Sequence, residues 1–566
     1  MIIDARTLEE GRLLEAELCI VGAGAAGLSL AAEFAAAGRD VVVLEAGGDK
    51  QTPQSQEIYE GELERDYPHP PPHMYRQRRL GGSTTIWGGR CVPFDPIDFE
   101  ARDYVPLSGW PFGYEDLVPF YRRAQAYLDA GEFAYDAGEA LPAEQRAFVE
   151  GFSDPDVGDQ TLERFSLPTN LFKKLRDSLV AHPNVTVVSN AACLRLKTRD
   201  GRRVVGAECV TGADRSLSVV ARRYVVAAGG MESVRLLFNS NDEHKAGLGN
   251  PHDVLGRYYM CHVEASIGTL RLTPAGRGVR YGFDRTRDGV YVRRKFIIGA
   301  DAQRRLGMLN FSARLHHASV IDPDHGDPIL SSMFLAKQFL LPEYRRKFSV
   351  LEHDSRRRSS QGAAFMASHL RNIVLGSPRL ALFTADWTWR RYLVERKLPY
   401  VALHSRRGVY PLDVNGEQAP NFDSRLTLGA SRDRHDQPRI RVDWRMNELD
   451  VHSVAAGLRL MRDRFDASGC GTVEFDDATL EDQVRESVPV GGHHIGGARI
   501  GATARQGVVD ADLKVHDIDN LFVASAAVFP TSSHANPTLT LVALGMRLAD
   551  HLKAVSAKST PEAAFA

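Results

Sequence analysis

Cysteine is scarce in this sequence, and its spacing argues against the common cysteine-based metal sites. The chain has six cysteines in 566 residues, at positions 19, 91, 193, 209, 261 and 470. None of them forms a CxxC pair, so neither structural zinc nor an iron–sulfur cluster is expected, and we predict no metal site. Scattered cysteines are typical of a reducing compartment, and we expect a cytoplasmic protein.

Long apolar runs and a large net charge are also missing. No segment reaches the roughly 18 consecutive apolar residues of a membrane-spanning helix, and residues 1–17 lack the apolar stretch of a signal peptide. The formal net charge of −2 argues against a nucleic-acid partner. An apolar content of 43% and a charged content of 25% are those of a globular protein. Because 566 residues exceed a single simple core, we expect two or more lobes.

What the sequence does contain is a strand, a glycine-rich turn and a helix close to its beginning. Residues 18–21 form a short apolar run, which is typical of a buried parallel strand. Residues 22–27 follow directly with the pattern GxGxxG, and an alanine-rich stretch at 31–37 predicts a helix. A second apolar strand at 41–44 is followed by Glu45. This order is typical of the first βαβ unit of a dinucleotide-binding fold.

Each glycine of this turn has a physical role. Gly22 permits the tight turn, Gly24 lets the backbone approach a pyrophosphate, and Gly27 lets helix and strand pack closely. The helix N-terminus offers free N–H groups and a partial positive charge to that pyrophosphate. Glu45 stands where an acid accepts hydrogen bonds from a ribose. We therefore predict a dinucleotide site; the alternative is an ordinary tight turn between strand and helix.

Two later stretches also favour a backbone that lies close to a flat ligand. Residues 79–89 contain four glycines and three hydroxyl residues around one tryptophan, a composition that makes a poor core. Residues 224–226 form another buried strand, which runs into Ala-Ala-Gly-Gly and then into a predicted helix at 231–238.

The rest of the chain changes pattern several times. Residues 185–226 predict a small β-meander, and residues 262–320 and 401–445 predict further strands, antiparallel in the first of these ranges. Residues 330–400 and 449–467 are predicted to be helical. The first helical range carries a basic cluster formed by Arg345, Arg346, Lys347, Arg356, Arg357 and Arg358. A solvated face is the simplest interpretation of this cluster, and an oligomer contact or an anionic membrane patch are the alternatives.

Two stretches near the C-terminus concentrate the candidate chemistry. Residues 491–501 have the sequence GGHHIGGARIG. Residues 520–540 contain a buried strand at 521–523, followed by small residues, a histidine and an asparagine. A final helix, predicted from about residue 538 to 552, points its N-terminus at this turn. Such a helix end stabilises negative charge on a ligand or an oxyanion.

Together these motifs resemble the glucose–methanol–choline (GMC) oxidoreductase family. The N-terminal GxGxxG, the 79–89 stretch, the HHxGxxRxG segment that begins at His493 and the Asn-Pro-Thr-Leu-Thr sequence that begins at Asn536 all match that family. The ANPTLT and GGSTTIWGG sequences are most similar to its pyranose-oxidase branch. The resemblance implies an α/β fold, in which a Rossmann-like FAD-binding domain of GMC type joins an α+β substrate domain built on an antiparallel sheet.

The resemblance also implies the division of the chain. Residues 1–261 and 481–566 are expected to form the two parts of the FAD-binding domain, the second with the catalytic histidine and asparagine. Residues 262–480 are expected to form the substrate-binding domain, with a helical insertion at about 330–400.

Roles for single residues follow from the same register. His493 matches the catalytic histidine of the family, and Asn536 matches a partner that is histidine or asparagine in relatives. His494 and His534 are secondary candidates for the substrate pocket. The implied FAD-binding positions are Gly22, Gly24, Ala25, Ala26, Gly27, Glu45, Ala46, Arg79, Gly81, Gly82, Thr84, Thr85, Trp87, Gly88, Gly89, Ala192, Cys193, Ala228, Gly229, Ser525, Ala526, Asn536, Pro537 and Thr538.

Two residues depart from the pyranose-oxidase pattern. Ile86 stands where that branch has a histidine bonded covalently to the flavin. Isoleucine cannot form that bond, so we expect non-covalent FAD. Gly88 replaces a threonine that faces the flavin N5 in that branch, so the oxygen-reacting pocket is expected to differ.

The function implied by the resemblance is FAD-dependent oxidation of a secondary alcohol of a sugar, glycoside or related polyol to a ketone. A hydride passes to the flavin N5, and His493 accepts the hydroxyl proton, since an unperturbed imidazole titrates near neutrality. A non-redox lyase on the same fold and oxidation of a non-sugar natural-product alcohol are the alternatives. The expected partners are a small-molecule alcohol and molecular oxygen or another electron acceptor. The sequence leaves open whether the protein forms a homo-oligomer.

Overall fold

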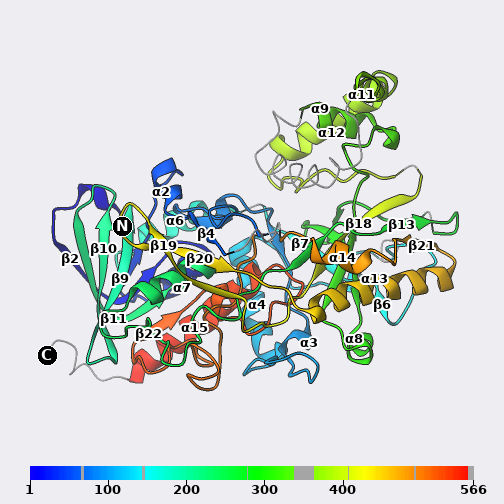
Figure 1. Cartoon of the computed structure of the whole chain (residues 1–566). Helices are drawn as coiled ribbons and strands as arrows, with labels where there is room; N and C mark the ends of the chain where they lie inside the picture. Colours follow the sequence, from blue (N-terminus) through cyan, green and yellow to red (C-terminus); the bar gives the residue numbers. More distant parts are fainter. Residues whose placement is uncertain are drawn as a thin grey trace.

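The computed structural model consists of a part with a largely parallel sheet, which carries the first and last helices, and a part with an antiparallel sheet at the other end (Figure 1). Each part has its own hydrophobic core. The structure describes residues 1–64, 69–142, 147–167, 169–276, 278–336, 362–405, 407–489 and 492–558.

The first part is built on a mixed sheet whose central strands are buried and parallel. In spatial order its strands are β1 (Ile2–Asp4), β8 (Val185–Ser189), β3 (Val41–Leu44), β2 (Arg12–Val21), β11 (Ser216–Val226), β10 (Arg203–Thr211) and β9 (Ala191–Arg199), and β22 (Leu521–Val523) also pairs with β11. In this spatial order each strand from β1 to β11 is parallel to the next one, and β22 is parallel to β11. β10 is antiparallel to both of its neighbours, β11 and β9. The predicted Rossmann-like α/β fold is confirmed.

The β-meander predicted for residues 185–226 needs two corrections. β8 is a central parallel strand between β1 and β3 rather than a member of the meander. The apolar runs at residues 217–220 and 224–226 predict two strands, but the structure has one continuous strand, β11. It pairs with β2 along nearly its whole length, with β10 at its beginning and with β22 at its end. Arg222, which is exposed, and Arg223, which is half-buried, interrupt the apolar pattern without interrupting the strand.

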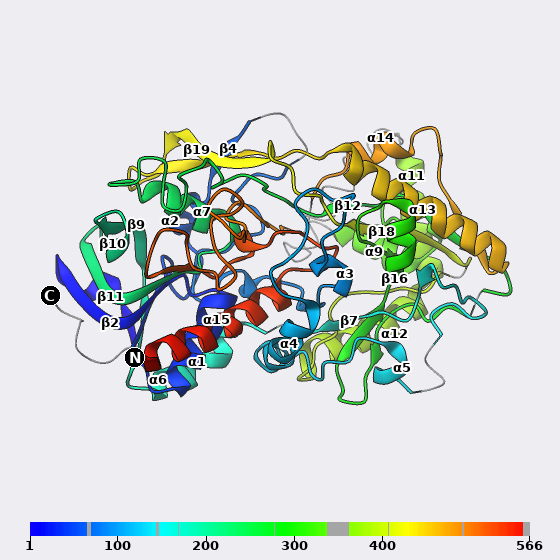
Figure 2. The ribbon, with the colours of Figure 1, turned by 90° about the horizontal axis from the view of Figure 1, so that it is seen from below.

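Helices from both ends of the chain pack together on this sheet. α1 (Ala25–Ala36) is rich in alanine, and α15 (Thr538–Lys558) lies along it, with α4 (Tyr114–Leu128) on the other side of α15 (Figure 2). α6 (Leu171–Ala181) also contacts α1, and α7 (Gly230–Asn239) follows β11. The C-terminal segment is therefore placed against the glycine-rich turn that begins α1.

The second part contains the antiparallel strands predicted for residues 262–320. The order of its sheet is β21 (Gly471–Glu474), β13 (Thr269–Leu272), β18 (Val409–Gly416), β17 (Phe311–Leu315), β16 (Phe296–Ile298) and β6 (Val157–Gly158), with β12 (Val263–Ala265) also paired to β18. The long helix α13 (Glu448–Ser468) covers this sheet with a buried face that includes Val454, Leu458 and Met461.

Smaller elements complete the described chain. A second antiparallel sheet has the order β14 (Asp284–Arg285), β15 (Tyr291–Arg294), β7 (Leu162–Phe165) and β5 (Arg90–Cys91). A small mixed sheet contains β19 (Arg425–Arg432), β20 (Pro438–Asp443) and β4 (Gly61–Leu63), with β4 parallel to β20. The remaining α-helices are α2 (Pro53–Glu57), α3 (Pro96–Phe99), α5 (Ala137–Ala140), α8 (Ala300–Leu306), α9 (Pro328–Ala336), α11 (Ala363–Leu375), α12 (Ser377–Thr388) and α14 (Leu480–Arg485).

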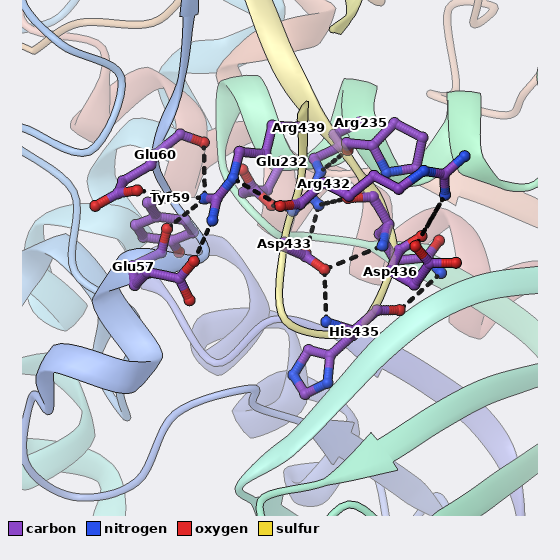
Figure 3. Close-up of polar contacts among 12 residues, drawn as sticks. Glu57, Tyr59, Glu60, Glu232, Arg235, Arg432, Asp433, His435, Asp436 and Arg439 are labelled. Carbon is purple, nitrogen blue, oxygen red and sulfur yellow. Dashed lines mark hydrogen bonds and ion pairs between the residues drawn. The ribbon is translucent and has the colours of Figure 1, made fainter. Parts of the chain in front are cut away.

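The β19–β20 hairpin packs in the first core, although its residues fall within the range predicted for the substrate domain. Arg235 of α7 donates a hydrogen bond of 2.5 Å to the carboxylate of Asp433, and this carboxylate also accepts the backbone N–H groups of His435 and Gln437 (Figure 3). Arg439 of β20 forms an ion pair with Glu57 of α2. The division of the chain at residues 262 and 480 stays a prediction.

The helical insertion predicted at about 330–400 contains α9, α11 and α12, which stand apart from the two sheets (Figure 1). The basic cluster of residues 345–347 and 356–358 lies outside the described residues. Among the residues that the structure does describe, no helix combines the length and apolar character needed to cross a membrane.

A buried ion pair connects distant segments of the two parts. Arg102 donates hydrogen bonds of 2.6 and 2.8 Å to the two carboxylate oxygens of Glu417, and the side chains are 2% and 0% exposed. Glu417 also accepts the backbone N–H of Asn310 at 3.0 Å. Removal of one partner would leave a buried charge without its counter-charge.

We expect the Arg102→Met variant to lose about 3–5 kcal/mol of unfolding free energy, because Glu417 then stays buried and unpaired. The matched control is Arg304→Met, since Arg304 pairs with Glu100 at the same 2.6 Å but both side chains are 45% exposed. That variant should lose less than about 1 kcal/mol. Thermal and chemical unfolding of the purified proteins measures both losses, and equal losses would contradict the expectation.

Candidate active site

The predicted dinucleotide turn between β2 and α1 is tightly packed at two of its three glycines. Gly22 has a φ of +113°, and a Cβ there would lie 2.5 Å from the carbonyl oxygen of Ala227. A Cβ on Gly27 would lie 2.0 Å from the carbonyl oxygen of Gly22. Both distances are far below van der Waals contact, so only glycine fits at these positions. The close approach of α1 to β2 and β11 therefore depends on the sequence pattern itself.

Gly24 is different, because a Cβ there would meet no atom of the described residues within 4 Å. Gly24 is the N-cap of α1 and has extended backbone angles, with φ −86° and ψ −165°. No side chain caps this helix, so the N–H groups of its first turn, which includes Ala25, Ala26 and Gly27, are available to a ligand. Such a helix N-terminus is suited to an anionic pyrophosphate.

Glu45 lies at the end of β3, where its carboxylate closes the turn. One carboxylate oxygen accepts the N–H of Ala23 at 3.0 Å, and the other accepts the N–H of Gly47 at 2.9 Å. Burial raises the pKa of the Glu45 carboxyl, whereas these two hydrogen bonds act in the opposite direction. Each oxygen keeps a second lone pair for a ribose hydroxyl.

Ala192 and Cys193, which the sequence predicts to lie near the adenine, are next to Glu45. The N–H of Ala191 donates to the carbonyl oxygen of Glu45 at 2.9 Å. This bond places Ala192 and Cys193, at the beginning of β9, beside the segment that contains Glu45 and Ala46.

The glycine-rich stretch 79–89 lies directly on the dinucleotide turn. The N–H of Gly81 donates to the carbonyl oxygen of Ala23 at 2.9 Å, and a Cβ on Gly82 would lie 3.1 Å from the Cα of Gly24. Arg79 donates to the carbonyl oxygen of Asp49, which anchors the start of this stretch.

The hydroxyl groups in this stretch have local partners. Thr84 and Thr85 donate to the carbonyl oxygens of Gly81 and Gly82 within a short 3₁₀ helix. Trp87 donates its ring N–H to the carbonyl oxygen of Thr169 at 2.9 Å. A Cβ built on Gly88 would have no atom of the described residues within 4 Å, so the backbone here borders open space.

Two further strand ends lie beside the dinucleotide turn. Gly229 follows Ala228 as the N-cap of α7 and has a φ of +85°. Among the described residues, no atom lies within 4 Å of a Cβ built on it. The N–H of Ala524 donates to the carbonyl oxygen of Val226 at 2.9 Å, which places the following residues, Ser525 and Ala526, beside this strand end. Ligands of such sheets bind at the carboxyl ends of the parallel strands, and the residues here fit a dinucleotide.

The catalytic pair predicted from the sequence is in contact. His493 Nε2 lies 2.9 Å from Asn536 Nδ2, although the two residues are far apart in the chain. The pairing of their segments explains this distance, because Gly496 and Ala498 donate backbone hydrogen bonds of 3.0 and 2.9 Å to Ala526 and Ala527. Asn536 then precedes Pro537 and Thr538, where α15 begins.

Two residues that the sequence analysis missed contact His493 from the antiparallel sheet. The Nδ1 atoms of His493 and His262 are 2.9 Å apart, and Oε1 of Glu264 lies 3.4 Å from His493 Nδ1. His262 and Glu264 are two residues apart at β12, a spacing that places both side chains on one face of a strand. This His-x-Glu spacing was the available signal, but nothing in the local sequence connects it to residue 493.

His494 belongs to a separate buried cluster. Its Nδ1 lies 2.7 Å from the hydroxyl of Tyr259, and this hydroxyl also lies 3.1 Å from Nε2 of His69. Burial holds the pKa of His494 well below its usual range, so the ring is neutral. The structure gives His494 a partner within the protein core, whereas His493 faces Asn536.

His534 also contacts buried groups other than His493 and Asn536. Its Nε2 lies 3.1 Å from a carboxylate oxygen of Asp95 and 3.3 Å from the Nζ of Lys295. Burial lowers the pKa of Lys295 to about 8 and also lowers the pKa of His534. These bonds join the C-terminal segment to the antiparallel sheet.

Comparison with known families identifies the chain. Residues 17–333 match the family model described as FAD dependent oxidoreductase, and residues 420–545 match the model described as GMC oxidoreductase. The chain is a GMC oxidoreductase. As an FAD-dependent enzyme of this family, it has the dinucleotide cofactor that the residues around the glycine-rich turn fit.

Full-length relatives of this GMC oxidoreductase are distant. The chain is 22% identical to the 6'''-hydroxyparomomycin C oxidase of Streptomyces lividus, over 95% of this chain and 92% of that protein. It is 23% identical to the fructose dehydrogenase large subunit of Gluconobacter japonicus, over 95% and 97%. The crystal structure of pyridoxine 4-oxidase from Mesorbium loti has a TM-score of 0.56 and 16% identity, over 95% and 99% of the two chains, which supports the fold. The likeness to pyranose oxidases stays a prediction.

Proposed function

We propose that this GMC oxidoreductase oxidises a secondary alcohol of a sugar, glycoside or related polyol to a ketone, with His493 as the base. The contact of 2.9 Å between His493 Nε2 and Asn536 Nδ2 carries the proposal. An amide nitrogen only donates, so the imidazole Nε2 that faces it accepts and carries a lone pair in place of a hydrogen. A substrate hydroxyl that takes the place of the amide N–H meets this unprotonated nitrogen, which is what a general base requires.

The two side chains can divide the work on one hydroxyl group. His493 Nε2 accepts the hydroxyl proton, and the Nδ2–H of Asn536 donates to the hydroxyl oxygen, which holds the carbinol carbon in one orientation. FAD, when bound, supplies the acceptor for the hydride from this carbon. The Oδ1 atom of Asn536 is buried and has no hydrogen-bond partner among the described residues, so the amide has capacity for a ligand.

The cofactor site is expected to hold FAD without a covalent bond. Gly22, Gly24, Gly27, Glu45 and Gly229 supply the close backbone approach and the ribose acceptor. Ile86 offers no nucleophile at the position where a covalent link would form.

The preference for a sugar rests on the relatives, which are named for hydroxyparomomycin C and fructose. The test is anaerobic reduction of the enzyme-bound flavin by a panel of hexoses, aminoglycosides and simple diols, followed by absorbance. Loss of the oxidised flavin band with a sugar or glycoside supports the proposal. Reduction by simple diols alone would contradict the sugar preference, and a reaction without any reduction would indicate a lyase. Hydrogen peroxide yield, compared with dye reduction, then identifies the electron acceptor.

A further inference from the structure

His262 and Glu264 lie behind the proposed base, on the side away from Asn536. His262 Nδ1 is 2.9 Å from His493 Nδ1, and Glu264 Oε1 is 3.4 Å from the same atom. The side chains of His493 and Glu264 are only 16% and 13% exposed, so their interaction takes place largely out of water. Neither His262 nor Glu264 is part of any motif that the sequence analysis singled out.

Backbone pairing fixes this arrangement. Met260 and Ile495 exchange two backbone hydrogen bonds, of 2.8 and 3.0 Å. These bonds lie two residues before His262 and two residues after His493, so the two histidine rings are brought together by a rigid bridge. β12, which contains Glu264, is in turn paired with β18.

The hydrogen-bond partners determine which ring nitrogens carry hydrogen. His262 Nε2 lies 3.2 Å from the carbonyl oxygen of Ser532, which can only accept, so this nitrogen carries the hydrogen. Burial holds the pKa of His262 well below its usual range, which keeps the ring neutral and leaves a lone pair on Nδ1. His493 Nδ1 must then donate to it, and His493 Nε2 is left without hydrogen.

The reaction would place a positive charge on His493 as it accepts the hydroxyl proton. The carboxylate of Glu264, 3.4 Å from Nδ1, stabilises that charge by Coulomb attraction, which is strong where water is largely excluded. The other titratable and charged groups that act on His262 are His534 and Arg314, and both oppose a charge on its ring. His262 therefore stays neutral, and Glu264 is the group that balances the imidazolium.

We propose that His262 and Glu264 are positioning residues for His493. His262 holds His493 in the tautomer with hydrogen on Nδ1 and none on Nε2, and Glu264 stabilises the protonated ring. This inference rests on the proposed function, in which His493 is the base. The roles differ, because His262 acts through a directional hydrogen bond and Glu264 acts through charge.

The same three side chains offer ligand atoms that lie within 4.8 Å of one another, which a metal ion would also accept. A bound metal ion and direct hydrogen bonds among these side chains predict opposite effects of a chelator. If the hydrogen bonds described above hold His493, dialysis of the holoenzyme against EDTA leaves its flavin reduction rate unchanged. Loss of that rate on dialysis, with recovery on addition of Zn²⁺, would overturn the proposal.

The main test uses three variants, and the rate of anaerobic flavin reduction is measured as a function of pH and of substrate concentration. His262→Phe keeps a ring of similar size but has no hydrogen-bond acceptor. Its limiting rate is expected to fall about 10- to 100-fold, a loss typical when the residue that hydrogen-bonds a functional histidine is removed. The substrate concentration at half the limiting rate should change little. His262→Gln can both accept from His493 and donate to Ser532, so its rate should return to within about threefold of wild type.

Glu264→Gln is expected to lower the limiting rate about tenfold and to shift the acid limb of the pH profile by about one unit. The sign is toward lower pH, because the loss of the negative charge disfavours the protonated imidazole. The neutral base then persists to lower pH, but it is a weaker base.

Matched controls separate this role from a structural one. His317 is a half-buried histidine whose ring bonds the adjacent carbonyl oxygen of Ala318, and His317→Phe should leave both rate and pH profile unchanged. The FAD content and unfolding temperature of each variant show whether it has folded. Folded His262→Phe and Glu264→Gln variants with wild-type rates and pH profiles would overturn the inference. If His493→Ala, measured in parallel, also reacts at the wild-type rate, the proposed function itself fails.

Discussion

Replacement of His493 by alanine is expected to leave FAD bound and to slow anaerobic flavin reduction by the alcohol about 10²- to 10⁴-fold. The reason is that the proposed proton acceptor is lost, while the glycine turn at Gly22, Gly24 and Gly27 is untouched. The protein should therefore remain yellow and fold normally. Stopped-flow absorbance of the flavin band measures the rate directly.

The control for this variant is His452→Ala. His452 lies on the exposed side of α13, where its ring contacts the carbonyl oxygen of Leu306 and neither His493 nor Asn536 among its described partners. It should reduce its flavin at the wild-type rate. A similar rate in His493→Ala would remove His493 from the mechanism, whereas loss of FAD from that variant would show that the side chain holds the cofactor site together.

The second large effect is expected at Gly24. Gly24→Val should keep its secondary structure, since its backbone angles suit valine and, in the part of the chain that the structure describes, no atom lies within 4 Å of the new Cβ. The variant should nevertheless be purified with less than about a tenth of the wild-type FAD, because the added side chain occupies the space in which a pyrophosphate approaches the backbone. Its unfolding temperature should fall as well, since a ligand that binds only the folded state stabilises it.

Gly362→Val is a closely matched control. Gly362 is also a helix N-cap with extended backbone angles, φ −95° and ψ 174°, and among the described residues no atom lies within 4 Å of a Cβ built on it. It begins α11 in the helical insertion, where no cofactor is expected. The ratio of flavin to protein absorbance should be normal in this variant. Equal FAD content in the two variants would show that the open space at Gly24 is not a pyrophosphate site.

The sequence predicted what depends on local chemistry. The turn at residues 22–27 was recognisable because steric limits leave only glycine at two of its positions. His493 and Asn536 were recognisable because their motifs are contiguous in the sequence. The strands of the parallel sheet were visible as apolar runs, since strands buried on both faces carry few polar residues.

What the sequence did not reveal depends on pairing between distant segments. The Arg222–Arg223 pair divided β11 in the sequence pattern, although its backbone pairs continuously with β2. The approach of His262 to His493 follows from the hydrogen bonds between Met260 and Ile495. A local hydrophobic pattern contains no information on such contacts, because either strand would look the same with another partner.

The central claim is that His493 and Asn536 act on the same hydroxyl oxygen, and a double-mutant cycle tests it most directly. The rate of anaerobic flavin reduction is measured for the wild type, His493→Ala, Asn536→Ala and the double variant. Because the two side chains share one reacting group, we expect non-additive effects: Asn536→Ala should slow the wild type much more than it slows His493→Ala. Effects that simply multiply, or single variants that react as fast as the wild type, would contradict the claim.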